Sequence, residues 1–502
     1  MQRVVQLAVI LVLGMSVSCG GGGGSESGSP PPPPPPPPPA NAIQVTLQPA
    51  QVFQTWEAWR GVLTGPNFID NTGTDRDAPP QVISDALDAL ADLGINGVRF
   101  QLHRNQNLEL TNDDNDPNNI VWSSFNFAQS YSADSGPHFT YPVKVMSQMI
   151  LPLRQRVMSR GEPFSIYVSV THMKQHFPAH WLIPAEYAEL AQATILWLQQ
   201  KSPNPPGFTA ITPNYWVIAN EPDIGGFSAT EIGGFIPAVG QRFAGMAGVN
   251  TKIQTTETAT PNMNYLNAVV NAAGVSPFVG IISFHSYDFS QSLANFYSLR
   301  NQTRTKAQGM GVRTAMTEIC CRSGWGGGSY TMGLGWARDI YWNATEADVS
   351  IWEPLALLTP CNTVGCTGGG NLDPVNLDRS LSGVFKFPAF YALRQFSHYI
   401  RPGYQRVGFV CGNCSQDATL GQNVKPLAFQ SAGGKIVAVV INDQAVSQPI
   451  SLLSLPAGTY DITGVDPTSG QTPVTYPTQT IGAGQALTVT FPALAILTFV
   501  QR

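Results

Sequence analysis

The segment that decides the fold is Tyr215-Trp216-Val217-Ile218-Ala219-Asn220-Glu221-Pro222-Asp223. A second segment has the same design and reads Val312-Arg313-Thr314-Ala315-Met316-Thr317-Glu318-Ile319. Each is an apolar or β-branched run followed by a carboxylate, which is typical of a buried strand with an acidic residue at its C-terminal end. In a barrel of parallel strands, the loops that leave those ends build the active site. Glu221 and Glu318 are therefore the first candidates for functional residues.

On either side of these segments, strand candidates alternate with amphipathic helix candidates. The strand candidates are Gly61–Thr64, Gly97–Leu102, Ser165–Val170, Tyr215–Ala219, Lys252–Thr256, Gly280–His285, Val312–Thr317 and Val349–Pro354. The helix candidates include Gln81–Leu93, Val143–Ser159, Pro184–Gln200, Thr230–Ala247 and Tyr330–Ala344. About eight such units predict an α/β fold of the (β/α)₈ TIM-barrel type over residues 54–402.

The pattern changes after Arg401-Pro402-Gly403, where short strand-like runs are separated by Gly, Pro, Asn and Asp. The runs are Lys425–Gln430, Lys435–Ile441, Gln448–Leu453, Thr459–Gly464, Thr472–Thr480 and Ala486–Thr490. They predict a C-terminal antiparallel β-sandwich over residues 403–502. A strand in residues 43–53, before the barrel, is expected to join this sandwich.

The N-terminus has the features of an export signal. Residues 1–19 combine Arg3, a short apolar run and small residues that lead to Cys19, a pattern that resembles a bacterial lipoprotein signal with lipidation at Cys19. The alternative is an ordinary signal peptide cut near Ser18. Residues 20–42 form a Gly/Ser and polyproline linker, either a spacer from a membrane or plain disordered chain. We therefore expect an exported protein, anchored to the bacterial (outer) membrane through Cys19 or else extracellular.

Composition narrows the function classes. The net charge is −5 and no basic stretch stands out, so a nucleic-acid partner is not expected. No cofactor or metal is expected. The protein is expected to be a monomer. Apart from Cys19, six cysteines remain, and in an exported chain they favour disulfides over a metal cluster, because no histidine lies at ligand spacing. The six are Cys320, Cys321, Cys361, Cys366, Cys411 and Cys414.

Two carboxylates at the mouth of a barrel suit the hydrolysis of a glycosidic bond. One must protonate the leaving oxygen, and in retaining enzymes the other attacks the sugar carbon from about 5–5.5 Å. Asn220, a short neutral donor and acceptor, suits a sugar hydroxyl beside Glu221. Glu257 ends the strand counted fifth and is the main rival for a catalytic role, although substrate contact is its expected role.

Three motifs resemble glycoside hydrolase family 30 within the clan of retaining TIM-barrel glycosidases. They are Asn220-Glu221-Pro222-Asp223, Thr317-Glu318, and the linking segment Tyr391–Gly403. The segment Gln54–Trp59 lies where that family has a conserved opening motif but matches it poorly. The resemblance implies that Glu221 is the acid/base and Glu318 the nucleophile, acting on xylan-type, β-glucan or glucosylceramide substrates.

Further site residues follow from their strand ends. Arg99 is a charge within an apolar strand, and we expect it to orient the nucleophile, as in the clan, or to form a structural ion pair. His285 and Tyr287 end the sixth strand, where the Tyr hydroxyl can hold the nucleophile. Trp352 ends the eighth strand and is expected to stack on sugar. His172 and Trp181, after the third strand, are expected to line the cleft.

These observations predict a retaining β-glycoside hydrolase of xylan or β-glucan type that works by double displacement. The main alternative is a catalytically inactive carbohydrate-binding lipoprotein on the same fold. A metal-dependent barrel hydrolase is a third reading, but it requires clustered His and Asp at strand ends, and only His285 and scattered others are available. The sugar and the linkage do not follow from the sequence.

Overall fold

The computed structural model describes residues 38–70, 72, 75–102, 108–109, 114–125, 127, 142–170, 173–288, 291–320, 328–361, 373–468 and 473–502. Pro37–Arg502 form one compact unit. Cys19 and the signal and linker segments before residue 38 lie outside the described residues, as does His172. Within the described residues, no helix has the length and apolar character that crossing a bilayer requires.

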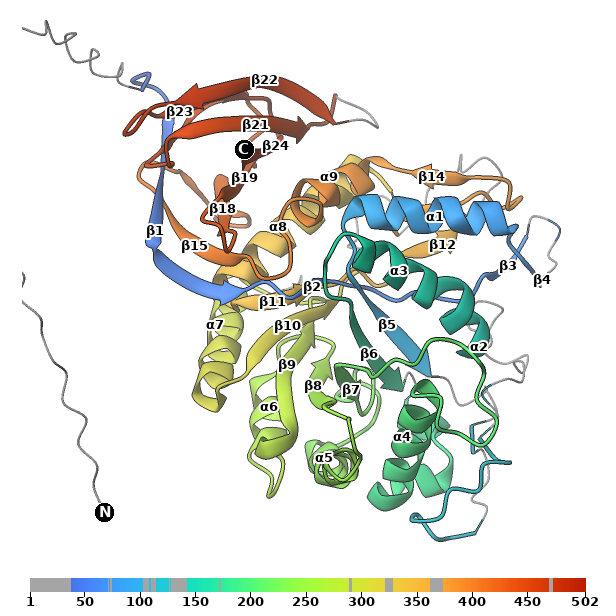
Figure 1. Cartoon of the computed structure of the whole chain (residues 1–502). Coiled ribbons are helices and arrows are strands. Elements are labelled where there is room, and N and C mark those ends of the chain that lie inside the picture. The colour runs from blue at the N-terminus through green and yellow to red at the C-terminus, as the bar shows by residue number, and fades with distance from the viewer. Residues whose placement is uncertain are drawn as a thin grey trace, which may run out of the picture. The chain divides into compact units, whose positions relative to one another are not determined.

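Eight parallel strands form the barrel (Figure 1), in the order β2-β11-β10-β9-β8-β7-β6-β5. A bridge between Val62 and Arg99 joins the first strand region to β5 and closes the sheet. The strands are β2 (Ala58–Trp59), β5 (Gly97–Leu102), β6 (Ser165–Val170), β7 (Tyr215–Val217), β8 (Lys252–Thr258), β9 (Val279–His285), β10 (Arg313–Glu318) and β11 (Val349–Trp352). The structure therefore confirms the predicted barrel.

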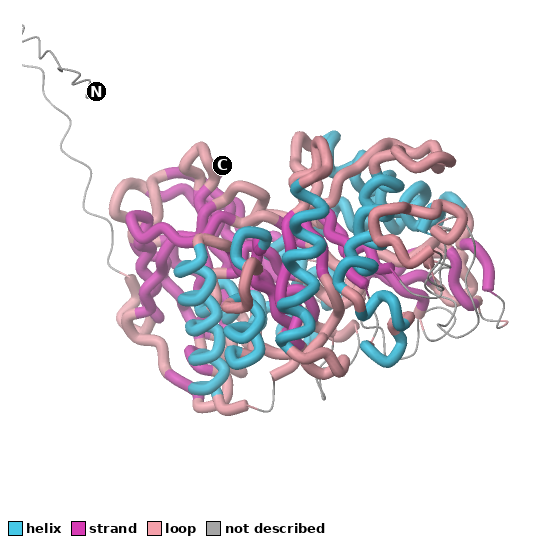
Figure 2. The backbone as a smooth tube through the Cα atoms, turned by 90° about the horizontal axis from the view of Figure 1, so that it is seen from below, coloured by secondary structure: helices cyan, strands magenta, loops and turns pink. Residues whose placement is uncertain are grey.

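Helices follow the strands and surround them (Figure 2). They are α1 (Pro80–Leu93), α2 (Pro142–Lys144), α3 (Leu151–Ser159), α4 (Pro184–Leu198), α5 (Ala229–Ala244), α6 (Met263–Val270), α7 (Leu293–Met310), α8 (Tyr330–Glu346) and α9 (Pro388–Ser397). Shorter helical segments are η3 (Val145–Ile150), η4 (Lys174–His176), η5 (Ala179–Leu182) and η6 (Ser276–Phe278). The apolar stripe predicted on α1 is buried, since Ile83, Leu87 and Leu90 lie in the core between helices and barrel.

The first strand differs from the prediction. It was expected at Gly61–Thr64, but regular pairing occurs at Ala58–Trp59 and is followed only by the bridge at Val62. Beyond Trp59 the backbone still bonds to both neighbouring strands, since the Arg60 amide donates to the Trp352 carbonyl at 3.2 Å and the Gly61 carbonyl accepts from the Arg99 amide at 2.9 Å. Gly61 also lies close to its neighbour, because a Cβ atom there would lie 2.9 Å from the Leu357 side chain.

The C-terminal region forms a nine-stranded sheet in the order β22-β21-β24-β19-β18-β15-β1-β20-β23, antiparallel except where β1 pairs with β20. Its strands are β1 (Ile43–Thr55), β15 (Gln405–Cys411), β18 (Val424–Gln430), β19 (Ile436–Asn442), β20 (Gln448–Leu453), β21 (Gly458–Val465), β22 (Val474–Ile481), β23 (Leu487–Phe491) and β24 (Ile496–Gln501). Phe491 of β23 and Phe499 of β24 have ring centroids 6.0 Å apart, so strands distant in the sheet share one core. The sheet is therefore curled into a sandwich.

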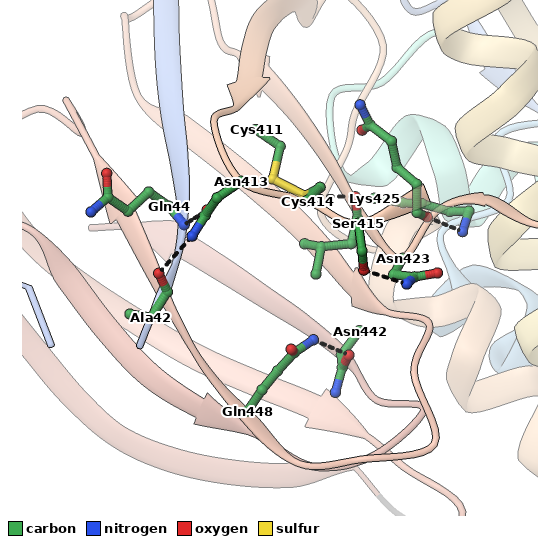
Figure 3. The surroundings of a disulfide bond; sticks show 12 residues. Ala42, Gln44, Cys411, Asn413, Cys414, Ser415, Asn423, Lys425, Asn442 and Gln448 are labelled. Carbon is green, nitrogen blue, oxygen red and sulfur yellow. Dashed lines mark hydrogen bonds between the residues drawn. A yellow bond between two sulfur atoms is a disulfide. The ribbon is translucent and has the colours of Figure 1, made fainter. Parts of the chain in front are cut away.

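Three smaller sheets complete the described strands. They contain β3 (Asn67–Ile69) with β4 (Asp75–Asp77), β12 (Leu358–Pro360) with β13 (Val375–Leu377) and β14 (Val384–Lys386), and β16 (Gln416–Asp417) with β17 (Gly421–Gln422). Between β15 and β16, a disulfide joins Cys411 and Cys414 (Figure 3). The Asn413 side chain in that loop accepts from the Gln44 amide at 2.8 Å and donates to the Ala42 carbonyl at 3.2 Å. Cys361 is also disulfide-bonded, whereas Cys321 and Cys366 lie outside the described residues.

Barrel and sheet are joined through helices α8 and α9. The Thr498 hydroxyl of β24 donates to the Gln395 carbonyl of α9 at 2.8 Å. Arg338 of α8 contacts Asp443, which follows β19, with its Nε 2.9 Å from Oδ1. The sheet thus contacts the helical layer of the barrel through α8 and α9. The candidate site lies elsewhere, at the C-terminal ends of the barrel strands.

Candidate active site

Glu221 and Glu318 come from the C-terminal ends of strands β7 and β10, which are separated in the barrel by β8 and β9, and their side chains approach each other. Glu318 is the last residue of β10, and Glu221 follows β7, which ends two residues earlier than predicted at Val217. One carboxylate oxygen of each, together with a ring nitrogen of His285, lie within 4.8 Å of one another. The Glu221 side chain is 21% exposed and that of Glu318 is 9% exposed, so solvent or a ligand can reach both.

Backbone strain marks two of these strand ends. Glu221 has φ of 43° and Glu257 has φ of 55°, in the left-handed region that residues with a Cβ atom seldom occupy. The Glu221 amide donates to the Glu257 carbonyl at 2.9 Å, so the two turns hold each other in place. Such strain costs about 1–3 kcal/mol per residue and collects at functional sites, where it aims side chains that a relaxed turn would direct elsewhere.

Two donors hold the Glu318 carboxylate. Arg99 Nη1 lies 2.8 Å from Oε2, and the Tyr287 hydroxyl lies 3.0 Å from Oε1. Burial by itself lowers the pKa of Arg99, but Tyr167 and the surrounding carboxylates outweigh it and raise that pKa, so the guanidinium stays charged. Burial raises the pKa of Tyr287, so its hydroxyl stays a donor. Arg99 Nη2 also contacts Asn220 Oδ1, which ties the residue before Glu221 to the same cation.

His285, the last residue of β9, sits between carboxylates and is fully buried. Its Nδ1 lies 3.0 Å from Glu221 Oε1 and its Nε2 lies 3.3 Å from Glu257 Oε2. Burial by itself lowers the pKa of His285, but the charges and hydrogen bonds of Glu318, Glu221 and Glu257 outweigh it and raise the pKa to about 10. His285 is therefore an imidazolium at neutral pH.

Glu257 does not have the role expected of it. Its side chain is 0% exposed, so the predicted substrate contact is wrong. The left-handed turn and a register irregularity between Thr256 and Thr258 direct the carboxylate into the barrel. There Oε1 accepts from Gln254 Nε2 at 2.7 Å and from the Thr317 hydroxyl at 2.6 Å.

The stacking role predicted for Trp352 is also wrong. Trp352 is 0% exposed, its ring lies against Trp336 of α8, and its indole NH donates to Asp339 Oδ2 at 2.8 Å. The reason is the alternation of side chains along a strand. Ile351 packs inside the barrel, so Trp352 points out to the helices and Glu353 points in.

Trp181 does not line a cleft either. It is 1% exposed, packs edge to face on Phe177 and has its indole NH 3.4 Å from Glu109 Oε2. Glu109, Glu186 and Glu189 form a buried carboxylate group beside it, at the start of α4. His172, which was predicted with Trp181, lies outside the described residues.

The sequence reasoning missed a polar network inside the barrel, below the site. Arg60 donates from Nε to Glu353 Oε1 at 2.7 Å and from Nη2 to Gln254 Oε1 at 3.1 Å. The Tyr167 hydroxyl donates to Glu353 Oε2 at 3.0 Å. Through Gln254 the network continues to Glu257 and so to His285. The available signal was a charge in an otherwise apolar strand segment, the same signal that singled out Arg99.

Glu221, His285 and Glu318 are also the residue types that ligate metals. Each of the three is also bonded within the site, His285 Nδ1 to Glu221 Oε1 at 3.0 Å and the Glu318 carboxylate to Arg99 and Tyr287.

No protein-family model matches the chain, and no curated protein does. Solved structures do share its fold. The catalytic domain of a GH30 xylanase C from Talaromyces cellulolyticus matches with a TM-score of 0.62 and 18% identity, covering 91% of this chain and 100% of that one. A GH30 endoxylanase from Clostridium papyrosolvens C71 matches with a TM-score of 0.61 and 15% identity, covering 91% and 100%. An endo-β1,6-glucanase matches with a TM-score of 0.60 and 14% identity, covering 92% and 95%.

Proposed function

We propose that this protein is a retaining glycoside hydrolase. The observation that carries the proposal is the approach of the Glu221 and Glu318 carboxylates to within 4.8 Å at the open end of the barrel. Retaining glycosidases hold their two carboxyl groups about 5–5.5 Å apart, whereas inverting ones need about 6.5–9.5 Å for an intervening water. The fold shared with xylanases and a β-glucanase supports the same reaction class.

Glu318 is the nucleophile in this proposal. Arg99 and Tyr287 each hold one of its oxygens, which fixes the orientation of the carboxylate. In the first step Glu318 attacks the anomeric carbon and the bond to the leaving oxygen breaks. The product is a covalent ester between the sugar and Glu318.

Glu221 is the acid and then the base. It is the more exposed of the two carboxyl groups, as the group nearest the departing sugar must be. It gives its proton to the leaving oxygen in the first step. In the second step it takes a proton from the water that attacks the ester, so enzyme and proton count are restored.

Asn220 supports sugar binding in the proposed site. Its Oδ1 is taken by Arg99, which leaves the amide NH₂ to donate to a sugar hydroxyl. The substrate that we propose is a β-linked polysaccharide or oligosaccharide of xylan or β-glucan type. Export, with a lipid on Cys19, would place the enzyme where such polymers occur and stays a proposal on the sequence of residues 1–19.

Mechanism-based trapping tests the proposal. A panel of xylans and β-glucans first identifies a polymer from which the protein releases reducing sugar. A matching 2-fluoro glycoside should then label Glu318, located by peptide mapping. A label on any other residue contradicts the nucleophile assignment, and binding of a polymer without hydrolysis would favour the inactive carbohydrate-binding alternative.

The acid/base role has its own test. Glu221→Ala should lose far more activity on natural substrates than on glycosides with good leaving groups, which need little protonation. Added azide should restore part of the rate, because it attacks the ester without a general base. Equal losses on both substrate types, with no rescue, would remove Glu221 from this role. Cys19→Ala, which should release the protein from membranes, tests the anchor independently.

A further inference from the structure

Glu257 is a buried carboxylate that no step of the proposed reaction uses. Its Oε1 accepts two hydrogen bonds, from Gln254 and Thr317, and its Oε2 lies 3.3 Å from His285 Nε2 and 3.8 Å from Arg99 Nη1. Burial opposes its charge, but the hydrogen bond from His285 and the charge of Arg99 hold the pKa of Glu257 well below its usual range. It is therefore a permanent negative charge next to the site.

His285 connects this charge to the acid/base. Its two ring nitrogens both face carboxylates, Nε2 toward Glu257 and Nδ1 toward Glu221, with Glu318 Oε1 3.8 Å from Nδ1. A neutral imidazole has one donor and one acceptor and can satisfy only one of these neighbours, whereas an imidazolium donates to both. The geometry is that of a charged ring.

Three carboxyl groups and a second cation surround His285. Among the described residues, the titratable groups that face it are Glu221 after β7, Glu257 on β8, Glu318 on β10 and Tyr287 on its own strand end. Arg99 of β5 faces Glu257 and Glu318. Two cations, Arg99 and His285, neutralise two carboxylates, Glu257 and Glu318. Glu221 is the third carboxyl group around the ring and the one that the proposed reaction uses as its acid.

We propose that Glu257 is a positioning residue that acts through His285, holding the imidazole doubly protonated throughout the catalytic cycle. This inference rests on the proposed function. A doubly protonated ring has no acceptor nitrogen, so it cannot take the proton that Glu221 must give to the leaving oxygen. The same positive ring then stabilises the Glu221 carboxylate formed when that proton has left.

Nuclear magnetic resonance of ¹⁵N-histidine-labelled full-length protein tests the inference. The chain has seven histidines, and the His285→Asn variant identifies the signal of His285. In the native protein, both ring nitrogens of His285 should stay protonated from pH 6 to beyond pH 9. In Glu257→Gln, the titration midpoint should fall by on the order of one to three pH units, because the nearest opposite charge is gone. A neutral His285 at pH 7 in the native protein, or an unchanged midpoint in the variant, overturns the proposal.

A matched control separates charge from packing. Thr317→Val removes a hydrogen bond from Glu257 Oε1, the oxygen that does not face His285, and keeps the charge, so His285 should titrate close to its native midpoint. If Glu257→Gln does not fold, Glu257→Asp replaces it. The native titration alone then still decides whether the ring is charged.

Activity provides the second measurement. In Glu257→Gln, the alkaline limb of kcat/KM on natural substrates should move to lower pH, because the ring loses its charge at a lower pH and then no longer stabilises the Glu221 carboxylate that forms when the proton leaves. Substrates with good leaving groups should show a smaller change. An alkaline limb that shifts equally on both substrate types would contradict the role through Glu221. If the 2-fluoro glycoside fails to label Glu318 in the native protein, the proposed function fails, while the titration still tests the ion pair.

Discussion

The interior of the barrel and the interior of the nine-stranded sheet are built on opposite principles. Inside the barrel, several ionisable side chains are buried. They are Arg60, Arg99, Glu257, His285, Glu318 and Glu353. The core of the sheet consists of aliphatic and aromatic side chains such as Val45, Ile450, Leu497 and Phe499. The buried pair Lys425–Asp443 of the sheet lies where Arg338 of α8 meets it, at the contact with the barrel.

This difference separates stability from function. Burying a charge costs several kcal/mol, and even a well-paired ion pair seldom stabilises a protein more than apolar residues of the same size would. A sheet that only supports its neighbour has no reason to bear that cost. The barrel bears it beside Glu221 and Glu318, which is what the proposed function requires of these charges.

The largest expected effect is on activity. Glu318→Gln should lower kcat by a factor on the order of 10⁴ or more, because a neutral amide cannot attack the sugar carbon. Steady-state rates on the best polymer measure it. The fold should be retained, since Gln has the size of Glu and accepts from Tyr287. Retention of more than about a tenth of the activity would mean that another residue is the nucleophile.

Arg99→Leu should be the most destabilising single change in the barrel. It removes one of the two cations that face the buried charges of Glu318 and Glu257, which costs about 3–5 kcal/mol. Urea unfolding at pH 7 measures the loss. The double variant Arg99→Leu with Glu318→Gln removes one of the stranded charges and should recover part of the stability. A double variant as unstable as the single one would show that packing, not charge, is responsible.

A change in the sheet should affect stability alone. Leu497 is fully buried in the core of the sheet, and Leu497→Ala should cost about 2–4 kcal/mol through lost burial and a cavity. The pH profile of kcat/KM should be unchanged in the folded variant. A shifted profile would show that the sheet tunes the site, and would weaken the contrast between the two interiors.

His285 in the barrel should make stability depend on pH. The pKa of His285 is raised from 6.5 to about 10, so the folded state binds its proton more tightly than the unfolded chain does. Its contribution is fully present below pH 6.5 and is lost as the pH rises toward 10. Between pH 6.5 and 9 the native protein should lose about 3 kcal/mol more than His285→Asn. Equal slopes for the two proteins would argue against the charged ring.

The smallest effect is expected at the surface of the sheet. The disulfide Cys411–Cys414 closes a loop with a sequence separation of 3. Removing it with Cys411→Ser and Cys414→Ser should cost at most about 2 kcal/mol, because a short loop restricts the unfolded chain little. Kinetics should be unchanged. A larger loss would mean that the loop is needed to hold Asn413 against β1.

The sequence alone was sufficient to predict the barrel and the residues that contact Glu318. Parallel strands bring their C-terminal ends together, so Glu221, Glu318, His285, Tyr287 and Arg99 had to meet once the strands were located. The wrong predictions came from the direction in which a side chain points from its strand. Trp352 ends the right strand but faces the helices, and counting from Ile351 in steps of two would have chosen Glu353.

The prediction for Glu257 was wrong for a different reason. Its direction depends on a left-handed residue and a register irregularity, and neither leaves a mark in the sequence Thr256-Glu257-Thr258. Arg60 was missed because the expected first strand began at Gly61, one residue after it, whereas the observed strand is Ala58–Trp59. Features that depend on backbone detail therefore required the structure, whereas those that depend on strand order did not.

The position of β1 has a consequence for the synthesis of the protein. Val45 pairs with Cys411 and Ile43 with Ile450, so the partners of this strand leave the ribosome several hundred residues after it does. At roughly 5–20 residues per second, the delay is about 20–80 s. During that time β1 exposes unpaired backbone and the apolar face that later enters the core. We expect the barrel to fold first, and refolding experiments should show the sheet maturing last, with aggregation suppressed by chaperones that bind extended apolar strands.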